Sequence, residues 1–315
     1  MISPLLDALQ DRVLVYDGAM GTQLQAANLS QEDFILREDQ TQSRIVSETA
    51  RNLNGVVLDG CNEILNFTRP DVIERVHRAY YSAGSDLVET NSFGATSIVL
   101  AEYDVPELVF DVNLAAAQIA RRAADSFTDR PRYVVGALGP GTKLVTLGQT
   151  TFEELRRTYT EGFLGLIEGG ADALLLETLQ DILMVKAGIA AAERAMGESG
   201  RKLPLFVQVT MEQTGTMLLG TEMGAALATI EAFPSVTAFG LNCATGPDEM
   251  AAHVRLLGQS STRPIAVQPN AGLPIMEGGQ AVYKLTPDEL AAFHDRAARE
   301  DGVALAGGCC GTTPA

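Results

Sequence analysis

Apolar residues follow two different spacings along this chain. In eight short segments they form nearly continuous runs rich in β-branched residues, and most of these runs end in Gly, Asn, Glu or Cys. The eight segments are residues 13–17, 86–91, 133–138, 173–178, 205–211, 238–243, 264–270 and 303–309. Runs of this length and composition are typical of parallel strands that are covered on both faces. The pattern therefore predicts eight parallel strands.

Between these runs, apolar residues recur at the spacing of an amphipathic helix. Residues 70–83 form one such stripe, and Gly84 follows it as a stop signal. Two further helices are preceded by the pattern of a capping box, in which a Thr is followed three residues later by a Glu. These two boxes begin at Thr151 and Thr286.

Strand and helix alternate through all eight strands, which predicts an α/β fold, the (β/α)8 TIM barrel. An open, doubly wound sheet is the alternative fold for the same alternation. Residues 28–66 are rich in polar and charged side chains and too long for a short connection, so we expect an excursion over the barrel top. No linker or low-complexity tract interrupts residues 1–315, and we expect one domain.

Composition narrows the class of protein. The chain has 315 residues, 46% of them hydrophobic, and a formal net charge of -17, which argues against nucleic acid as a partner. The N-terminus lacks the pattern of a signal peptide, and no apolar stretch reaches the roughly 18 residues of a membrane span, so we expect a cytoplasmic protein with no membrane contact. Four cysteines in so long a chain are too few for a disulfide framework, which favours metal ligands or nucleophiles.

Three of the four cysteines fall at the ends of predicted strands. Cys243 ends the sixth strand, and Cys309 and Cys310 end the eighth, so all three are expected on the carboxyl rim of a barrel, where catalytic groups lie. The glycines around the vicinal pair permit the backbone turn that would let both thiols reach one ion. Three thiolates leave one position of a Zn²⁺ ion open, as in a catalytic site. The alternatives are unrelated core thiols or a strained vicinal disulfide.

A zinc site of three thiolates suits a particular chemistry. It can take a substrate thiol in the fourth position and hold it as the nucleophilic thiolate, which favours alkylation of a thiol over hydrolysis. The fourth cysteine, Cys61, lies in the excursion and is interpreted as a bystander. The histidines His77, His253 and His294 lie in helical patterns away from the strand ends, and we expect surface or helix-face residues rather than ligands.

Polar residues on the same rim are candidates for binding a substrate. Asp17 and Glu177 could hold an ammonium group by charge-assisted hydrogen bonds, although Asp17 could instead form a turn or a helix cap. The backbone of Ser92, Phe93 and Gly94 could offer amide groups to a carboxylate, unless this segment is a plain turn.

Taken together, these motifs resemble the homocysteine S-methyltransferase family, whose members are zinc-containing (β/α)8 barrels. The matching segments are residues 17–22, 89–93, 139–140, 177–178, 240–243, 269–272 and 307–314. The resemblance implies that Cys243, Cys309 and Cys310 bind zinc and carry the catalysis. It also implies that Asp17 and Glu177 hold the amino group of homocysteine and that the Ser92, Phe93 and Gly94 backbone receives its carboxylate. Asn270, which ends the seventh strand in a matching segment, is a further candidate for substrate binding.

Within the family, residues 139–144 and 308–314 look most like the homocysteine-binding module of cobalamin-dependent methionine synthases. This implies methylcobalamin as the methyl donor, methionine as the product, and folate- and cobalamin-binding domains in the same polypeptide. No eighth helix follows the eighth strand, so we expect a piece of a longer protein. The excursion differs from the shorter connection of the stand-alone enzymes. The alternatives are a stand-alone enzyme that uses S-methylmethionine, S-adenosylmethionine or betaine, and a zinc-binding module without catalysis.

Overall fold

The computed structural model describes residues 4–273, 275–277 and 280–315, and within them all eight predicted strands form. The strands pair side by side in parallel, in the order β1-β10-β7-β6-β5-β4-β3-β2. They are β1 (Leu14–Val15), β2 (Leu87–Glu89), β3 (Tyr133–Leu138), β4 (Ala173–Leu179), β5 (Leu205–Val209), β6 (Val236–Asn242), β7 (Ile265–Gln268) and β10 (Val303–Ala306). Most are shorter than predicted, because the apolar runs continue into the loops at the rim.

Asp86 joins the two strands at the ends of this sheet. Its backbone N–H donates to the Val15 carbonyl at 2.7 Å, and its carboxylate accepts the Val15 N–H at 3.0 Å. The same carboxylate accepts two N–H groups of Arg12, each at 2.7 Å. These bonds bring β1 beside β2, so the sheet closes into a barrel and the open doubly wound alternative is wrong.

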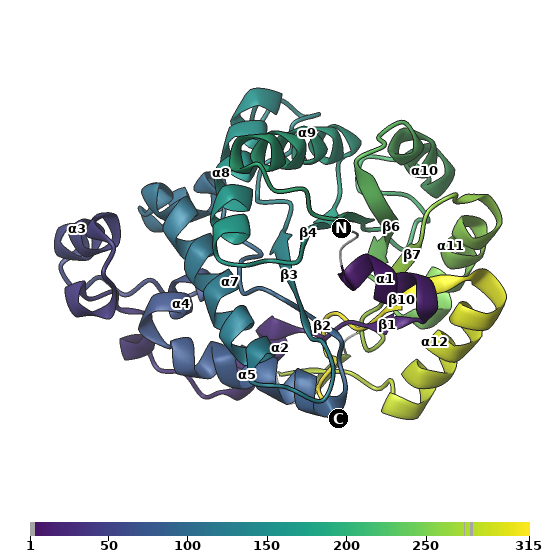
Figure 1. Ribbon diagram of the computed structural model, residues 1–315, viewed down its shortest axis with the longest axis horizontal. Helices are drawn as coiled ribbons and strands as arrows, with labels where there is room; N and C mark the ends of the chain where they lie inside the picture. Colours follow the sequence, from purple (N-terminus) through teal and green to yellow (C-terminus); the bar gives the residue numbers. More distant parts are fainter. Residues whose placement is uncertain (1–3, 274, 278–279) are drawn as a thin grey trace.

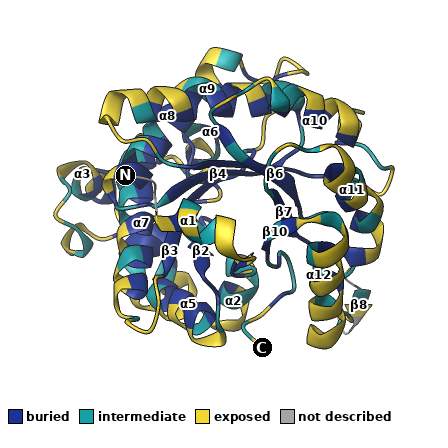
Figure 2. Cartoon of the chain, turned by 45° about the vertical axis from the view of Figure 1, so that its right-hand side comes forward, coloured by how far each residue is buried: buried dark blue, intermediate teal, exposed yellow. Residues whose placement is uncertain are grey.

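Helices cover the outside of the barrel, with buried inner faces and exposed outer faces (Figure 2). All the described α-helices, including α1 and α3, which lie elsewhere, are α1 (Pro4–Asp11), α2 (Met20–Ala26), α3 (Arg44–Leu53), α4 (Leu65–Thr68), α5 (Pro70–Ala83), α6 (Ser97–Leu100), α7 (Val109–Asp125), α8 (Phe152–Glu168), α9 (Ile182–Ser199), α10 (Met223–Glu231), α11 (Pro247–Ser260) and α12 (Pro287–Asp301). Short 3-10 helices are η1 (Gln31–Phe34), η2 (Glu38–Gln40), η3 (Asn62–Ile64), η4 (Ala101–Tyr103) and η5 (Pro106–Leu108). None of the described helices is long and apolar enough to cross a membrane.

Local signals in the sequence set where these helices begin and end. Helix α5 has the predicted bounds and stops at Gly84, whose φ of 119° favours glycine. Thr286 forms the full capping box of α12. Thr151 caps α8 by accepting the Glu154 N–H at 3.1 Å, but the Glu154 carboxylate bonds to the Thr150 hydroxyl, so only half of that predicted box forms.

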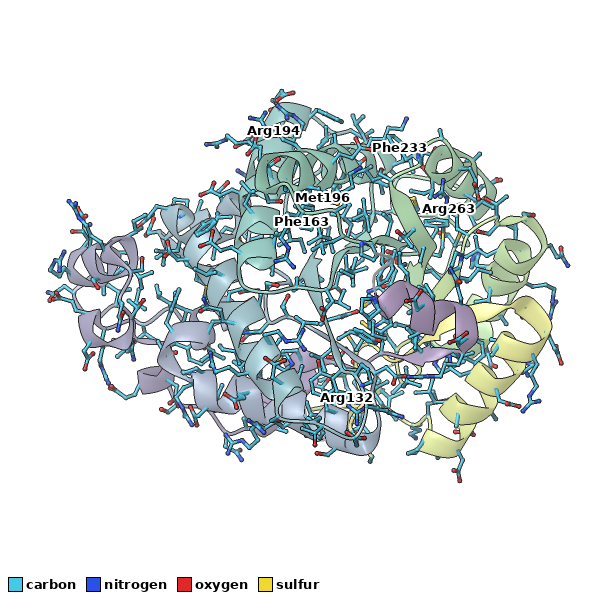
Figure 3. The ribbon with its side chains drawn as sticks, viewed as in Figure 1. Arg132, Phe163, Arg194, Met196, Phe233 and Arg263 are labelled. Carbon is cyan, nitrogen blue, oxygen red and sulfur yellow. The ribbon has the colours of Figure 1, made fainter. Side chains whose placement is uncertain are left out.

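Two apolar layers hold the barrel together. Inside it, residues such as Leu14, Leu87 and Leu305 pack in one cluster with Leu5 of α1, which lies across one end of the barrel (Figure 1). Outside it, Phe163 of α8 is fully buried and Met196 of α9 packs against the same core, where these two helices meet (Figure 3). With one end filled by α1, the opposite rim is left for a site.

The excursion at residues 28–66 takes a different path from the one expected. Helix α3 stands beside the barrel, beyond α4 and α7, rather than over its top (Figure 1). Phe34, Val46 and Leu58 are buried, and they connect the excursion to the main apolar core. Its last part, η3 and the start of α4, returns to the barrel rim, where Asn66 Nδ2 donates to the Asn91 carbonyl at 2.9 Å. A second insertion, the antiparallel hairpin β8 (Ile275–Glu277) and β9 (Gln280–Val282), lies between β7 and α12.

Candidate metal centre and substrate pocket

Strand β6 and the loop after β10 bring three thiols together. The sulfur atoms of Cys243, Cys309 and Cys310 all lie within 4.8 Å of one another, and those of Cys243 and Cys310 are 3.8 Å apart. All four cysteines are free thiols, so the vicinal disulfide alternative is wrong. The prediction that three thiols from two distant segments meet at one rim is confirmed.

Backbone geometry fixes these sulfur positions. Cys243 and Ala244 have φ angles of 62° and 60°, in the left-handed region that non-glycine residues seldom adopt. Gly311 has a φ of 81°, and a side chain there would collide with the ring of Tyr283. Cys309 N–H donates to the Pro269 carbonyl at 2.8 Å. The turn that the glycines were expected to permit is therefore present, and its backbone is held by neighbouring loops.

Asn270 belongs to this bracing rather than to the pocket wall. Its side-chain oxygen accepts the Cys310 N–H at 3.1 Å, and it is 5% exposed. The residues that line the pocket do not include it. The structure thus places this candidate behind the thiols, where it positions Cys310.

The donor set fits a soft metal ion such as zinc. Hydrogen bonding to Cys243 and Cys309 lowers the pKa of Cys310 to about 3. Hydrogen bonding to Cys243 and Cys310 instead raises the pKa of Cys309. Three thiolates this close repel one another, so a cation is needed before all three can ionise. The cluster is consistent with a zinc site that has three protein ligands.

The remaining candidate ligands lie elsewhere. Cys61 is fully buried among apolar residues, as expected of a bystander. Within the part of the chain that the structure describes, the grouping of possible metal ligands that includes the three thiols contains no histidine. His77 is fully buried on α5. His294 lies on helix α12 as expected, and its Nε2 is 2.8 Å from the carbonyl oxygen of Gly307, the residue after β10.

Three carboxyl groups face the same pocket from the ends of β1, β2 and β4. They belong to Asp17, Glu89 and Glu177. Burial, together with the charge of Glu89, raises the pKa of Asp17 and of Glu177 well above the ordinary range, and burial raises the pKa of Glu89 to about 7. Sequence reasoning placed Glu89 at a strand end but gave it no role. Its position on the same rim as Asp17 was the available signal.

Asp17 does not cap a helix. Helix α2 starts at Met20 after Ala19, and no side chain caps it. One oxygen of Asp17 accepts the Glu89 N–H at 3.0 Å, which ties β1 to β2, and the other oxygen is buried without a partner. The helix-cap alternative for this residue is therefore wrong.

The loop after β2 is held by the end of the excursion. Gly94 N–H donates to Glu63 Oε1 at 2.6 Å, and Ser92 N–H donates to the Thr90 carbonyl at 2.8 Å. Of the three amides expected to receive a carboxylate, only that of Phe93 makes no hydrogen bond within the described residues. Glu63 is 7% exposed. Sequence reasoning missed this residue because no pattern in residues 28–66 indicated which of their side chains would reach the rim.

Thiols and carboxyl groups share one cavity of about 450 Å³. Ser92 and Phe93 line it on the β2 side, and Tyr283, which follows the hairpin, lines it near the thiols. A cavity of this size encloses a small ligand. Its wall offers soft sulfur atoms at one place and buried acids at another.

Comparisons with known proteins agree with this arrangement. The homocysteine S-methyltransferase family profile matches residues 14–315. The chain is 50% identical over 313 residues to methionine synthase from Mycobacterium tuberculosis (strain ATCC 25618 / H37Rv) and 51% identical over 312 residues to methionine synthase from Mycobacterium leprae (strain TN). These matches cover 99% and 98% of this chain but 24% of each relative. The chain thus spans about a quarter of the length of these curated relatives.

Solved structures show the same fold. The metallated form of the homocysteine methyltransferase MmuM from Escherichia coli has a TM-score of 0.72 to this chain at 22% identity, and the match covers 98% of this chain and 96% of that one. The apo form has a TM-score of 0.68, with 98% and 95% covered. At this identity the likeness supports the barrel alone, whereas the family match extends over nearly the whole chain. The protein belongs to the homocysteine S-methyltransferase family.

Proposed function

We propose that this chain binds homocysteine and activates its sulfur for methyl transfer, giving methionine, as the homocysteine-binding part of a cobalamin-dependent methionine synthase. The observation that carries the proposal is the cluster of three thiols beside buried carboxyl groups in one cavity. The 50% identity to methionine synthases supports the choice of reaction. This chemistry needs reduced thiols, which the cytoplasm maintains.

In this proposal Cys243, Cys309 and Cys310 hold a zinc ion. Zinc, when bound, supplies a Lewis acid with an open fourth position, which lowers the pKa of a substrate thiol. All three cysteines line the cavity, so they would hold the ion at its wall and would leave one position for a substrate thiol. Asn270 keeps Cys310 in place through its backbone amide.

The other polar groups orient the substrate. Asp17 and Glu177 hold the ammonium group of homocysteine, because each presents a buried carboxyl group to the cavity. The backbone at Ser92, Phe93 and Gly94 receives the carboxylate. The Phe93 N–H can donate to it without breaking a hydrogen bond to another described residue. Fixing both ends of the amino acid directs its thiol toward the three cysteines, which is catalysis by positioning.

The methyl group comes from methylcobalamin, brought by folate- and cobalamin-binding domains of the same polypeptide. Homocysteine releases its thiol proton to solvent on binding, and the sulfur then attacks the methyl carbon. The new sulfur–carbon bond forms as the bond between the methyl carbon and its carrier breaks, and both electrons of that bond stay with the carrier. The carrier supplies the bond chemistry, and the barrel supplies the nucleophile.

A donor comparison tests this proposal. Zinc-loaded protein is incubated with homocysteine and, in separate reactions, with methylcobalamin, S-methylmethionine, S-adenosylmethionine or betaine, and methionine is measured by mass spectrometry. We expect methionine from methylcobalamin alone. Methionine from one of the other donors would instead identify a self-sufficient enzyme.

X-ray absorption at the zinc edge distinguishes a zinc ion that binds the substrate from one that has only a structural role. Homocysteine should raise the number of sulfur ligands from three to four. A zinc spectrum that homocysteine does not alter would indicate a closed, non-catalytic site.

A further inference from the structure

We propose that Glu89 is a third acceptor for the substrate ammonium group, so that Asp17, Glu89 and Glu177 form a socket of three carboxyl groups. The inference rests on the proposed function, because it assumes that the ligand is an amino acid. Neither the sequence nor the family match assigns a role to Glu89. Its side chain lines the same cavity as the other two acids and comes from the end of the neighbouring strand β2.

Each of the three acids has one oxygen held by the protein and one without a hydrogen-bond partner among the described residues. Asp17 Oδ2 accepts the Glu89 backbone N–H, and Oδ1 has no partner. Glu177 Oε2 accepts Asn242 Nδ2 at 3.3 Å and the Thr178 hydroxyl at 3.4 Å. Glu89 Oε1 accepts Gln268 Nε2 at 2.9 Å. The second oxygens of Glu89 and Glu177 make no hydrogen bond within the described residues.

The amides that hold Glu89 and Glu177 are themselves oriented. Gln268 uses its oxygen to accept Gln208 Nε2 at 2.6 Å, so its NH₂ group must face Glu89. Asn242 uses its oxygen to accept the Thr178 N–H at 2.8 Å, so its NH₂ group must face Glu177. Both amide side chains are almost fully buried, at 2% exposed each. The carboxyl groups are thus fixed by neutral donors, which leave their charge uncompensated.

Ligand chemistry follows from this count. A primary ammonium group has three N–H donors, and the socket has three carboxyl oxygens without a hydrogen-bond partner among the described residues. Among the described residues that line the cavity there is no Lys or Arg to act as a counter-ion. Buried carboxylates without a cation are costly. A ligand that brings the cation satisfies all three acids at once.

The test compares two ligands that differ only in the amino group. Homocysteine and 4-mercaptobutanoate share the thiol, the carbon chain and the carboxylate, but only homocysteine carries the ammonium. Both are titrated calorimetrically into zinc-loaded wild type and Glu89→Gln, in which the amide oxygen can still accept from Gln268. We expect Glu89→Gln to bind homocysteine about 10- to 100-fold more weakly and 4-mercaptobutanoate within about twofold of wild type.

Controls separate this role from a structural one. Glu161→Gln changes a partly buried acid on the outer helix α8 and should leave both affinities unchanged. Glu89→Met, of similar length but without oxygen, should repeat the selective loss, and zinc content and thermal unfolding show that either variant is folded. Equal losses for both ligands, or no loss for homocysteine, would overturn the role of Glu89. Failure of wild type to bind either ligand would instead overturn the proposed function.

Discussion

The thiols on one side of the cavity and the carboxyl groups on the other are held in position by different means. On the thiol side the backbone does the positioning, through left-handed residues at Cys243 and Gly311, and the sulfurs contact one another. On the acid side, side-chain amides such as Gln268 and Asn242 hold two of the carboxyl groups from within the barrel, and the backbone departs from regular strand only locally, at Thr178, whose φ is 57°. Like charges are therefore gathered in two places by two different means.

Because of this difference, the thiols and the carboxyl groups place different demands on what binds to them. Three thiolates this close repel one another, so all three can ionise together only when a cation is bound. The acids already have one oxygen each in a fixed hydrogen bond, so they are preorganised before any substrate arrives. Substitutions on the two sides should consequently fail in different assays, zinc binding for the thiols and substrate binding for the acids.

The largest effect is expected from removing a thiol. A structural zinc with four ligands is bound with ~10–16 kcal/mol, or roughly 3 kcal/mol per ligand, so Cys310→Ala or Cys243→Ala should weaken zinc binding by roughly a hundredfold or more. Zinc per chain, measured by elemental mass spectrometry after dialysis against a chelator, checks this. Cys61→Ala is the matched control and should keep its zinc. Full zinc retention by the Cys310 variant would remove it from the ligand set.

On the acid side, Glu177→Gln should separate substrate from metal. The change removes a buried charge that we assign to the ammonium, and hydrogen bonds to charged groups contribute ~1.5–3 kcal/mol, so homocysteine should bind about 10- to 100-fold more weakly. Calorimetric titration measures the affinity, and zinc content should equal that of wild type. Loss of zinc together with substrate would mean that the two sides are not independent.

Sequence pattern was sufficient for the parts of the site that lie at or just after the strand ends. The eight apolar runs located the strands, and the convergence of strand ends on one rim located Cys243, Cys309, Cys310, Asp17 and Glu177 in one cavity. Those residues follow from the fold because parallel strands all end on the same side. Their roles as ligands and as substrate contacts remain predictions.

Residues brought in by long insertions could not be found in this way. Glu63 reaches the cavity at the end of the excursion, and Tyr283 reaches it after the β8–β9 hairpin. Neither segment has a periodicity that fixes where it packs. Asn270 is the opposite case. The sequence predicts it at a strand end and therefore in the pocket, but its side-chain oxygen accepts the Cys310 N–H instead. Rim position alone does not tell a pocket residue from a bracing one.

A smaller effect is expected at the carboxylate end of the cavity. Glu63→Ala removes the acceptor of the Gly94 N–H, and an unmade buried hydrogen bond costs ~1 kcal/mol, so ligand affinity should fall about fivefold. Both homocysteine and 4-mercaptobutanoate should be affected equally, because both carry a carboxylate. Glu63→Gln keeps an acceptor oxygen and should restore binding. A loss confined to homocysteine would instead connect Glu63 with the ammonium group.

The last effect concerns the pH dependence of folding in protein free of metal and substrate. Burial raises the pKa of Glu89 to about 7, so ionising this group opposes folding, and its cost grows as pH rises from about 4.5 to 7 and is constant above that. Glu89→Gln cannot ionise and should therefore gain stability relative to wild type as pH rises across this window. Asp17, Glu177 and Tyr16 surround Glu89 and share its field, so the gain should be gradual.

Urea unfolding at pH 5 and pH 8 measures that difference, and the sign is decisive. If Glu89 were paired with a cation of the protein, its pKa would be lowered and wild type would gain stability over Glu89→Gln as pH rises through the acidic range. A gain for the variant at pH 8 means that the acid side is a set of carboxyl groups without an internal counter-ion. Adding homocysteine to zinc-loaded wild type should then reduce the gap, because the ammonium supplies the charge that the barrel lacks.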